Sequence, residues 1–204
     1  MKVIDLSMPI VHGDGRLGLT VSVDTPYTFD NCGWQGSTFS MFAHYATHVD
    51  APLHFIRDGM TIDQVPLQSL IGPASVIELS DHGESAGISG DMLEDRGRHV
   101  EKGDIAILRT GWTDKYWGSE KFWREGPFLL GDGADWLVER GVKSVVYDFS
   151  VIIAVVHDFS VSVASIIMYT WVCRKTRKAS SRHWSSATMK SGLLGLKPSQ
   201  KCSR

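Results

Sequence analysis

The sequence predicts one α/β domain, in which strands alternate with loops and helices over residues 1–150. Two observations support this class. Segments with the pattern of strands are separated by loop and helix patterns, an order typical of α/β domains. The chain has 204 residues, of which 43% are hydrophobic, enough for one globular domain with a core. We find neither internal repeats nor a G-x-S-x-G nucleophile elbow.

The N-terminal segments have β-like patterns. Residues 2–10 are predicted to form a short strand. Residues 13–18 fit G-x-G-x-x-G, but residues 19–23 are β-like, whereas a dinucleotide fingerprint needs a helix at that place. We therefore interpret residues 13–18 as a glycine-rich turn. Residues 37–43 then form an apolar stretch that directly precedes a histidine-rich segment.

The middle of the chain shows the alternation most clearly. Residues 66–70 are predicted as a helical turn, residues 74–79 as a strand and residues 89–94 as the start of a short helix. Residues 104–109 are nearly continuous in apolar side chains, which predicts a buried strand. Two strands with a helix between them are thus expected here.

An aromatic segment follows, with Trp112, Tyr116, Trp117, Phe122 and Trp123 close together. One interpretation is a surface loop that is docked by its aromatic side chains. The other is the wall of a pocket for a flat substrate. We favour the docked loop.

A helix and a strand complete the predicted α/β part. Residues 131–140 have the pattern of a helix, and Gly141 is placed to cap its C-terminus. Residues 142–149 are then predicted to form a strand.

The chain changes character after Ser150. Residues 151–204 contain nine basic residues and one acid, a net charge of +8, whereas residues 1–150 contain 12 basic and 22 acidic residues, a net charge of −10. Residues 151–173 are strongly apolar, and a basic run and a serine-rich end follow. The chain is therefore divided into a core of residues 1–150 and a divergent tail of residues 151–204.

Three interpretations of the tail remain open. One is a transmembrane segment with a basic flank, but His157, Asp158 and several serines interrupt it, and these are costly in lipid. A second is a buried strand pair followed by a disordered basic end. The third, which we favour, is a core whose original end has been replaced, for instance by a reading-frame change. On that interpretation we expect residues 151–204 to pack poorly on the core.

Three histidines and an aspartate within eleven residues are the most informative feature: His44, His48, Asp50 and His54. Imidazole and carboxylate groups are the usual ligands of Zn²⁺ and similar divalent ions. A spacing of four puts two side chains on one face of a helix, and a spacing of two puts them on one face of a strand. Pro52 favours an extended conformation at the preceding residue. A helical turn or tight loop running into extended chain would therefore bring His44, His48 and Asp50 together.

The simplest alternative is that these histidines are structural or solvated. A lone H-x-x-x-H pair is more often that than a metal site, but the added aspartate and third histidine favour a metal site. His54 lies beyond the proline, so it is either a further ligand or a base beside the metal.

The same window closely resembles H-x-G-T-H-x-D-x-P-x-H, the signature of the cyclase family of metal-dependent hydrolases, which includes kynurenine formamidase and isatin hydrolase. It departs from this pattern at Ala46, where the family has glycine, and alanine would be strained there if the position needs a positive φ. The resemblance covers about residues 1–150. Further stretches that resemble the family in the same order are residues 5–10, 54–59, 71–77, 103–112 and 141–148.

The resemblance implies a mixed-sheet fold of the swivelling β/β/α type with an atypical C-terminal part. It implies Zn²⁺ or Mn²⁺ on His44, His48 and Asp50, with His54 as the catalytic acid–base. The implied reaction is hydrolysis of amide-type C–N bonds in an arylformamide or a cyclic amide, and lactone or ester hydrolysis is an alternative. Trp34 and the aromatic segment would suit an aryl substrate.

The family completes its metal centre, often with two metals, through a later histidine and a glutamate. His157 is the only candidate near the expected place, and no glutamate follows Glu139. A weak or inactive metal-binding relative is therefore a second alternative.

Composition excludes some partners and favours one compartment. The net charge of −2 gives no overall bias toward nucleic acid or an anionic membrane. Cys32, Cys173 and Cys202 are few and odd in number, and the N-terminus lacks a long apolar stretch, so we expect a cytoplasmic protein without a disulfide framework. Self-association into a homo-oligomer is expected from the resemblance only.

Overall fold

The computed structural model describes residues 6–16, 19–150 and 167–170. Two compact units hold these residues. The larger unit contains the described parts of residues 1–10 and 43–175, and the smaller contains those of residues 11–42. Each unit is described by itself.

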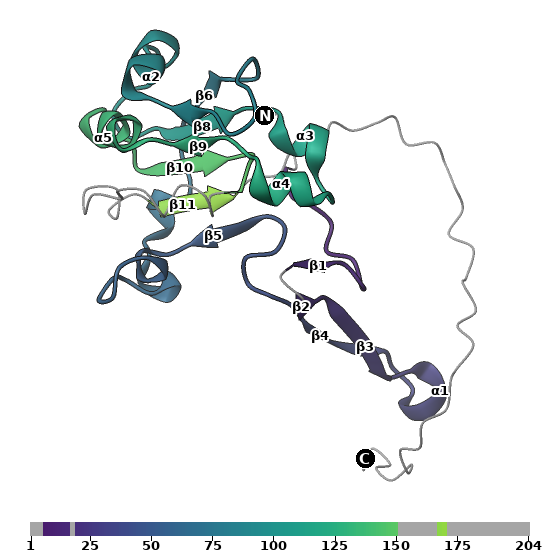
Figure 1. The fold of residues 1–204 in the computed structure, drawn as a ribbon. Coiled ribbons are helices and arrows are strands. Elements are labelled where there is room, and N and C mark those ends of the chain that lie inside the picture. The colour runs from purple at the N-terminus through teal and green to yellow at the C-terminus, as the bar shows by residue number, and fades with distance from the viewer. Residues whose placement is uncertain (1–5, 17–18, 151–166, 171–204) are drawn as a thin grey trace. The chain divides into compact units, whose positions relative to one another are not determined.

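A five-stranded mixed sheet is the centre of the larger unit (Figure 1). Four strands run parallel, and β5 at one edge runs antiparallel to its neighbour β11. The strands in spatial order are β5 (His48–Asp50), β11 (Ile167–Thr170), β10 (Ser144–Tyr147), β8 (Ile105–Arg109) and β6 (Ala74–Glu78). The strands predicted from residues 74–79, 104–109 and 142–149 are confirmed, as is the α/β class with a mixed sheet.

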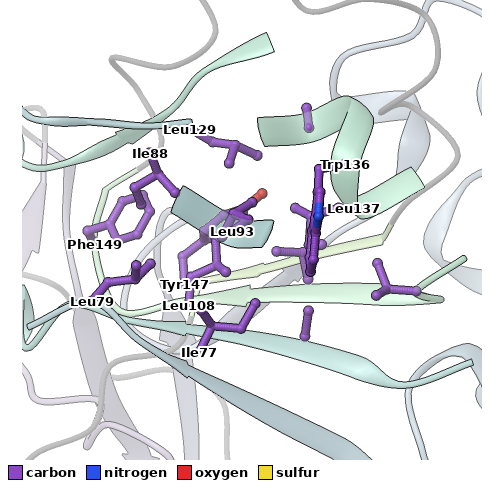
Figure 2. Packing of buried hydrophobic residues seen from close by; sticks show 14 of the residues in the cluster. Ile77, Leu79, Ile88, Leu93, Leu108, Leu129, Trp136, Leu137, Tyr147 and Phe149 are labelled. Atoms are coloured by element: carbon purple, nitrogen blue, oxygen red, sulfur yellow. The ribbon is translucent and has the colours of Figure 1, made fainter. Parts of the chain in front are cut away.

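The hydrophobic core lies where helices α2 (Gly90–Arg96) and α5 (Gly131–Glu139) pack against this sheet (Figure 2). Leu93 of α2 and Leu137 of α5 are fully buried, together with Ile77 of β6 and Leu108 of β8. Burying a side chain of this size contributes about 1.5–3 kcal/mol to the free energy of folding. The continuous apolar pattern of residues 105–108 reflects this burial.

Both predicted helices begin or end where their capping residues indicate. Helix α2 starts at Ser89, whose hydroxyl accepts a hydrogen bond from the amide of Met92. Gly141 follows α5 with a φ of 70°, the left-handed conformation that ends helices. Each of these helices directly follows a short strand, and the two strands, β7 (Gly87–Ile88) before α2 and β9 (Phe128–Leu129) before α5, pair in parallel.

The aromatic segment is helical, so the predicted surface loop is wrong. It forms α3 (Trp112–Tyr116) and α4 (Glu120–Arg124), and Ser119 caps the second helix by accepting from the amide of Phe122. Trp112 and Phe122 are buried in the core. The burial of these two rings stabilises helices that are too short to persist alone.

Residues 6–10 do not form the predicted strand; residues 2–5 of that prediction lie outside the described residues. The amide of Met8 donates to the Thr47 hydroxyl, 3.0 Å away, and Pro9 has no amide hydrogen to give. Neither residue can therefore donate to a strand ladder.

Three 3₁₀ turns connect the histidine segment to β6. They are η1 (Pro52–His54), η2 (Ile62–Gln64) and η3 (Leu67–Ser69). The turn η3 confirms the helical turn predicted for residues 66–70.

The smaller unit is built from two antiparallel strand pairs and one helical turn. Its strands confirm the β structure that was predicted for residues 19–23. The elements are β1 (Gly15–Arg16), β2 (Leu19–Thr20), β3 (Ser22–Tyr27), α1 (Phe29–Cys32) and β4 (Gly36–Ser40).

Four residues of the predicted tail belong to the central sheet. Strand β11 pairs in parallel with β10 and antiparallel with β5. The expectation that the tail packs poorly is therefore wrong for Ile167–Thr170, because both edges of this strand are paired. The rest of residues 151–204, including His157, lies outside the described residues. Within the described chain, no helix combines the length and apolar character needed to cross a membrane.

Candidate metal centre

A tight turn and a short strand position the histidine segment. His44 lies in the turn that precedes β5, and His48 and Asp50 are the first and last residues of that strand. Successive side chains of a strand point to opposite faces, so residues two apart share one face. The predicted arrangement, a tight loop running into extended chain, is confirmed.

The structure brings one atom from each of the three side chains together. His44 Nδ1 lies 3.3 Å from His48 Nε2 and 2.7 Å from Asp50 Oδ1, and His48 Nε2 lies 3.6 Å from the same oxygen. Two ligands that each lie 2.0–2.2 Å from a tetrahedral Zn²⁺ are separated by about 3.4 Å. Two of the three separations match this value, and the third would have to open by about 0.7 Å.

Asp50 has the environment expected of a buried metal ligand. It is 5% exposed, and its Oδ1 atom accepts no hydrogen bond from the described residues. A buried carboxylate oxygen without a donor is costly, on the order of 1–3 kcal/mol or more for a charged group. The 2.7 Å contact with His44 Nδ1 lacks hydrogen-bond geometry, so it does not supply the missing donor.

The turn before β5 fixes the orientation of His48. Its Nδ1 atom lies 2.8 Å from the carbonyl oxygen of Ala46. Ala46 has a φ of 58°, so this position does need the positive φ that glycine adopts more readily. A non-glycine residue in this conformation carries about 1–2 kcal/mol of strain.

These residues fit a single divalent ion. Two imidazoles and one carboxylate, with one position left for water, make up a common catalytic zinc site. The described residues contain this one group of three or more such side chains whose ligand atoms lie within 4.8 Å of one another. The fit rests on the donor atoms and on the unpartnered Asp50 oxygen.

His54 lies beside the three side chains without joining them. Its ring centroid is 4.0 Å from that of His44, and it ends the turn η1. Burial lowers the pKa of His54, and nearby His44 lowers it further, while the Asp50 carboxylate opposes both effects. The His54 residue is nevertheless exposed to solvent.

Two aromatic residues lie beside the site, and one of them is distant from it in the sequence. The Phe55 ring lies 4.1 Å from the His54 ring, and buried Tyr147 of β10 lies near the Asp50 carboxylate. Burial, with a smaller contribution from Asp50, raises the pKa of Tyr147, so its phenol stays protonated. Tyr147 is almost a hundred residues from Asp50 in sequence, and no local pattern links them.

The aromatic residues that were expected to suit an aryl substrate have different surroundings. Trp112 and Phe122 belong to the core, whereas Trp117 lies 5.9 Å from the ring of Tyr45, the residue after His44. Trp34 stacks on Tyr27 within the smaller unit, with ring centroids 4.7 Å apart.

The sequence of this chain is similar to a known protein family. Residues 4–152 match the family model described as "Putative cyclase". A kynurenine formamidase of Bacillus cereus is 31% identical over 153 residues, which cover 71% of this chain and 67% of that protein. A kynurenine formamidase of Paracidovorax citrulli is 42% identical over 86 residues, covering 39% of this chain and 38% of that protein.

Solved structures share the fold. Isatin hydrolase A from Ralstonia solanacearum superposes with a TM-score of 0.67 at 22% identity, covering 86% of this chain and 80% of that one. A predicted metal-dependent hydrolase from Bacillus stearothermophilus gives a TM-score of 0.60 at 23% identity, covering 82% of this chain and 80% of that one. At such identities the likeness concerns the fold alone.

Proposed function

Because the chain belongs to the cyclase family, we propose that it is a divalent-metal-dependent hydrolase of amide-type C–N bonds in small molecules. The observation that carries this proposal is that His44 Nδ1, His48 Nε2 and Asp50 Oδ1 lie close together, and that the buried Asp50 oxygen has no hydrogen-bond donor among the described residues. The substrate class, an arylformamide or a cyclic amide, follows the kynurenine formamidases and isatin hydrolases to which the chain is similar.

In this proposal the three converging side chains hold the ion. A bound divalent ion supplies two things: it lowers the pKa of a water molecule toward neutrality and polarises the substrate carbonyl. His44 and His48 bind through neutral nitrogens, and Asp50 adds one negative charge that remains inside the protein. A site with three protein donors of this kind would keep a position for water or substrate.

His54 moves the proton. Its lowered pKa keeps the imidazole neutral near pH 7, so an unprotonated ring nitrogen is available to accept a proton from the attacking water. The same nitrogen then gives the proton to the leaving amine nitrogen. The exposed side of His54 allows both transfers, while packing on His44 keeps the ring beside the three ligands.

Metal content and hydrolysis, measured on the purified full chain, test the proposal. Elemental analysis would follow loading with Zn²⁺ or Mn²⁺, and formanilide, isatin and an aryl lactone would serve as substrates. We expect about one ion per chain and faster cleavage of the two amides. Asp50→Asn and His48→Ala should both lose the ion, whereas His82→Ala, which changes a histidine outside the group, should keep it.

The outcomes separate the alternatives. Stoichiometric metal without turnover would identify a catalytically impaired relative, and faster lactone cleavage would identify an ester hydrolase that uses the same centre. A chain that binds no ion under any loading condition would refute the proposal. We further propose that the ion is Zn²⁺ or Mn²⁺ and that the chain forms a homodimer, because the chain belongs to the cyclase family. We propose a cytoplasmic location because the composition shows few cysteines.

A further inference from the structure

Ala46 combines backbone strain with deep burial directly beside the candidate metal centre. Its φ is 58°, and its side chain is 3% exposed. Ser85, with a φ of 51°, is the other non-glycine residue with a positive φ in the part of the chain that the structure describes. Such outliers persist only where surrounding structure determines them, and they cluster at functional sites.

The Ala46 carbonyl determines which His48 nitrogen carries the hydrogen and which keeps its lone pair. The carbonyl oxygen lies 2.8 Å from His48 Nδ1 and can only accept a hydrogen bond. Nδ1 must therefore carry the hydrogen, and in neutral imidazole this leaves Nε2 with its lone pair. Nε2 is the atom that lies 3.3 Å from His44 Nδ1 and 3.6 Å from Asp50 Oδ1.

We infer that Ala46 is a positioning residue whose left-handed conformation holds its carbonyl against His48 and thereby sets the tautomer and direction of that ligand. This inference rests on the proposed metal-binding function. Partners that hold the second nitrogen of a metal-bound histidine usually change metal affinity by about 10- to 100-fold when they are lost. Here the partner is a backbone atom, so only the conformation of residue 46 can move it.

Substitutions that change this conformation provide the test. Valine is strongly disfavoured at positive φ, so Ala46→Val should turn the carbonyl away from His48, whereas Ala46→Gly keeps the conformation without strain. Ser85→Val imposes the same backbone conflict at a residue outside the group of candidate ligands. Ala134→Val adds the same two methyl groups at a buried position of α5.

Two measurements on the full chain would be made. Nitrogen-15 NMR of metal-free protein reports the His48 tautomer, and competition with a chelator gives the Zn²⁺ affinity. We expect the Nδ1–H tautomer in the unsubstituted chain and in Ala46→Gly. In Ala46→Val we expect mixed tautomers and an affinity about 10- to 100-fold lower. Ser85→Val and Ala134→Val should be less heat-stable yet bind Zn²⁺ as the unsubstituted chain does.

The inference is overturned if metal-free His48 carries its hydrogen on Nε2, or if Ala46→Val binds Zn²⁺ within about threefold of the unsubstituted chain, below the usual effect of losing such a partner. The tautomer measurement decides even if Ala46→Val does not fold. An unsubstituted chain that binds neither Zn²⁺ nor Mn²⁺ would refute the proposed function, whereas the metal-free tautomer would still show whether Ala46 orients His48.

Discussion

At the scale of single residues, we propose different roles for neighbouring histidines of the candidate centre: two as ligands and one as the acid–base. His44 and His48 each direct one nitrogen toward the Asp50 carboxylate, while His54 packs on His44 without entering that group. The difference follows from backbone position, because His48 lies in β5 and His54 in the turn after Pro52. Ligand and acid–base roles can therefore be tested separately.

Replacing His54 by alanine should leave metal binding intact and slow hydrolysis by about 10²-fold or more, the usual contribution of a positioned acid–base group. Metal content and kcat would be measured on the same preparation. Loss of the ion from this variant would make His54 a ligand instead, and an unchanged rate would remove it from the mechanism.

Gly59 allows the backbone to pass close to the turn that carries His54. A Cβ atom at this position would lie 2.7 Å from the Leu53 amide nitrogen and 2.7 Å from the Pro52 carbonyl carbon. Gly59→Ala should therefore displace η1, lower stability by about 1–3 kcal/mol and reduce kcat more than metal content. Gly83→Ala is a matched control, because a Cβ there meets nothing within 4 Å. Equal kcat values in the two variants would contradict this role.

At the scale of elements, polar contacts fix the strands of the sheet near their ends. Asp104, directly before β8, accepts hydrogen bonds from the Ser75 hydroxyl of β6 at 2.6 Å and from the Glu101 amide at 3.1 Å. At the other end of β8, buried Asp148 accepts from the amide of Thr110 at 2.9 Å. Burial raises the pKa of Asp148, although these donors oppose the change.

The Asp104 contacts predict a pH dependence of stability. The Ser75 hydroxyl, followed by the Glu101 amide, lowers the pKa of Asp104 below its ordinary value of 3.8. Because the pKa is lower in the folded state, the stabilisation is present above pH 3.8 and is lost as the pH falls through the folded-state pKa.

Asp104→Asn should accordingly cost about 1–2 kcal/mol near neutral pH, because hydrogen bonds to a charged acceptor are replaced by bonds to a neutral one. The difference in unfolding free energy between the two proteins, measured by urea titration, should shrink below about pH 4. Asp63→Asn, which changes an exposed carboxylate of η2, serves as the control. A difference that grows on acidification would contradict the assignment.

At the scale of the whole larger unit, the strand that carries two of the proposed ligands joins the sheet through β11. The strand order places β11 between β5 and β10, so β5 has no described strand partner other than β11. A segment whose sequence does not resemble the family thus supports the strand that holds His48 and Asp50. The division into a core of residues 1–150 and a separate tail remains a prediction for the other tail residues.

A chain shortened to residues 1–150 should therefore lose Zn²⁺ affinity as well as stability, because β5 would have an unpaired edge. A chain of residues 1–175 keeps β11 and should bind Zn²⁺ as the full chain does. Chelator competition and thermal unfolding of both chains would be compared. Full Zn²⁺ affinity in the shorter chain would show that β11 is dispensable for the centre.

The sequence by itself determined the strands at residues 74–79 and 104–109, both capped helices and the segment that contains the candidate centre. These features depend on local periodicity, caps and spacing, which act within a few residues. The sequence did not predict that residues 112–124 are helical, because those short helices depend on burying Trp112 and Phe122 in a core made by distant segments. It also did not predict that Met8 donates to Thr47 and that residues 6–10 form no strand.

Only the tertiary structure decided which atoms of the centre meet and what supports them. The spacing of His48 and Asp50 predicted a shared face, but the turn that precedes β5 brings His44 to them, and pairing with β11 holds their strand in the sheet. Contacts between residues far apart in the chain depend on how whole elements pack, and no local pattern records that packing. This is why the donor set could be read from eleven residues, whereas the orientation of His48 and the place of Tyr147 could not.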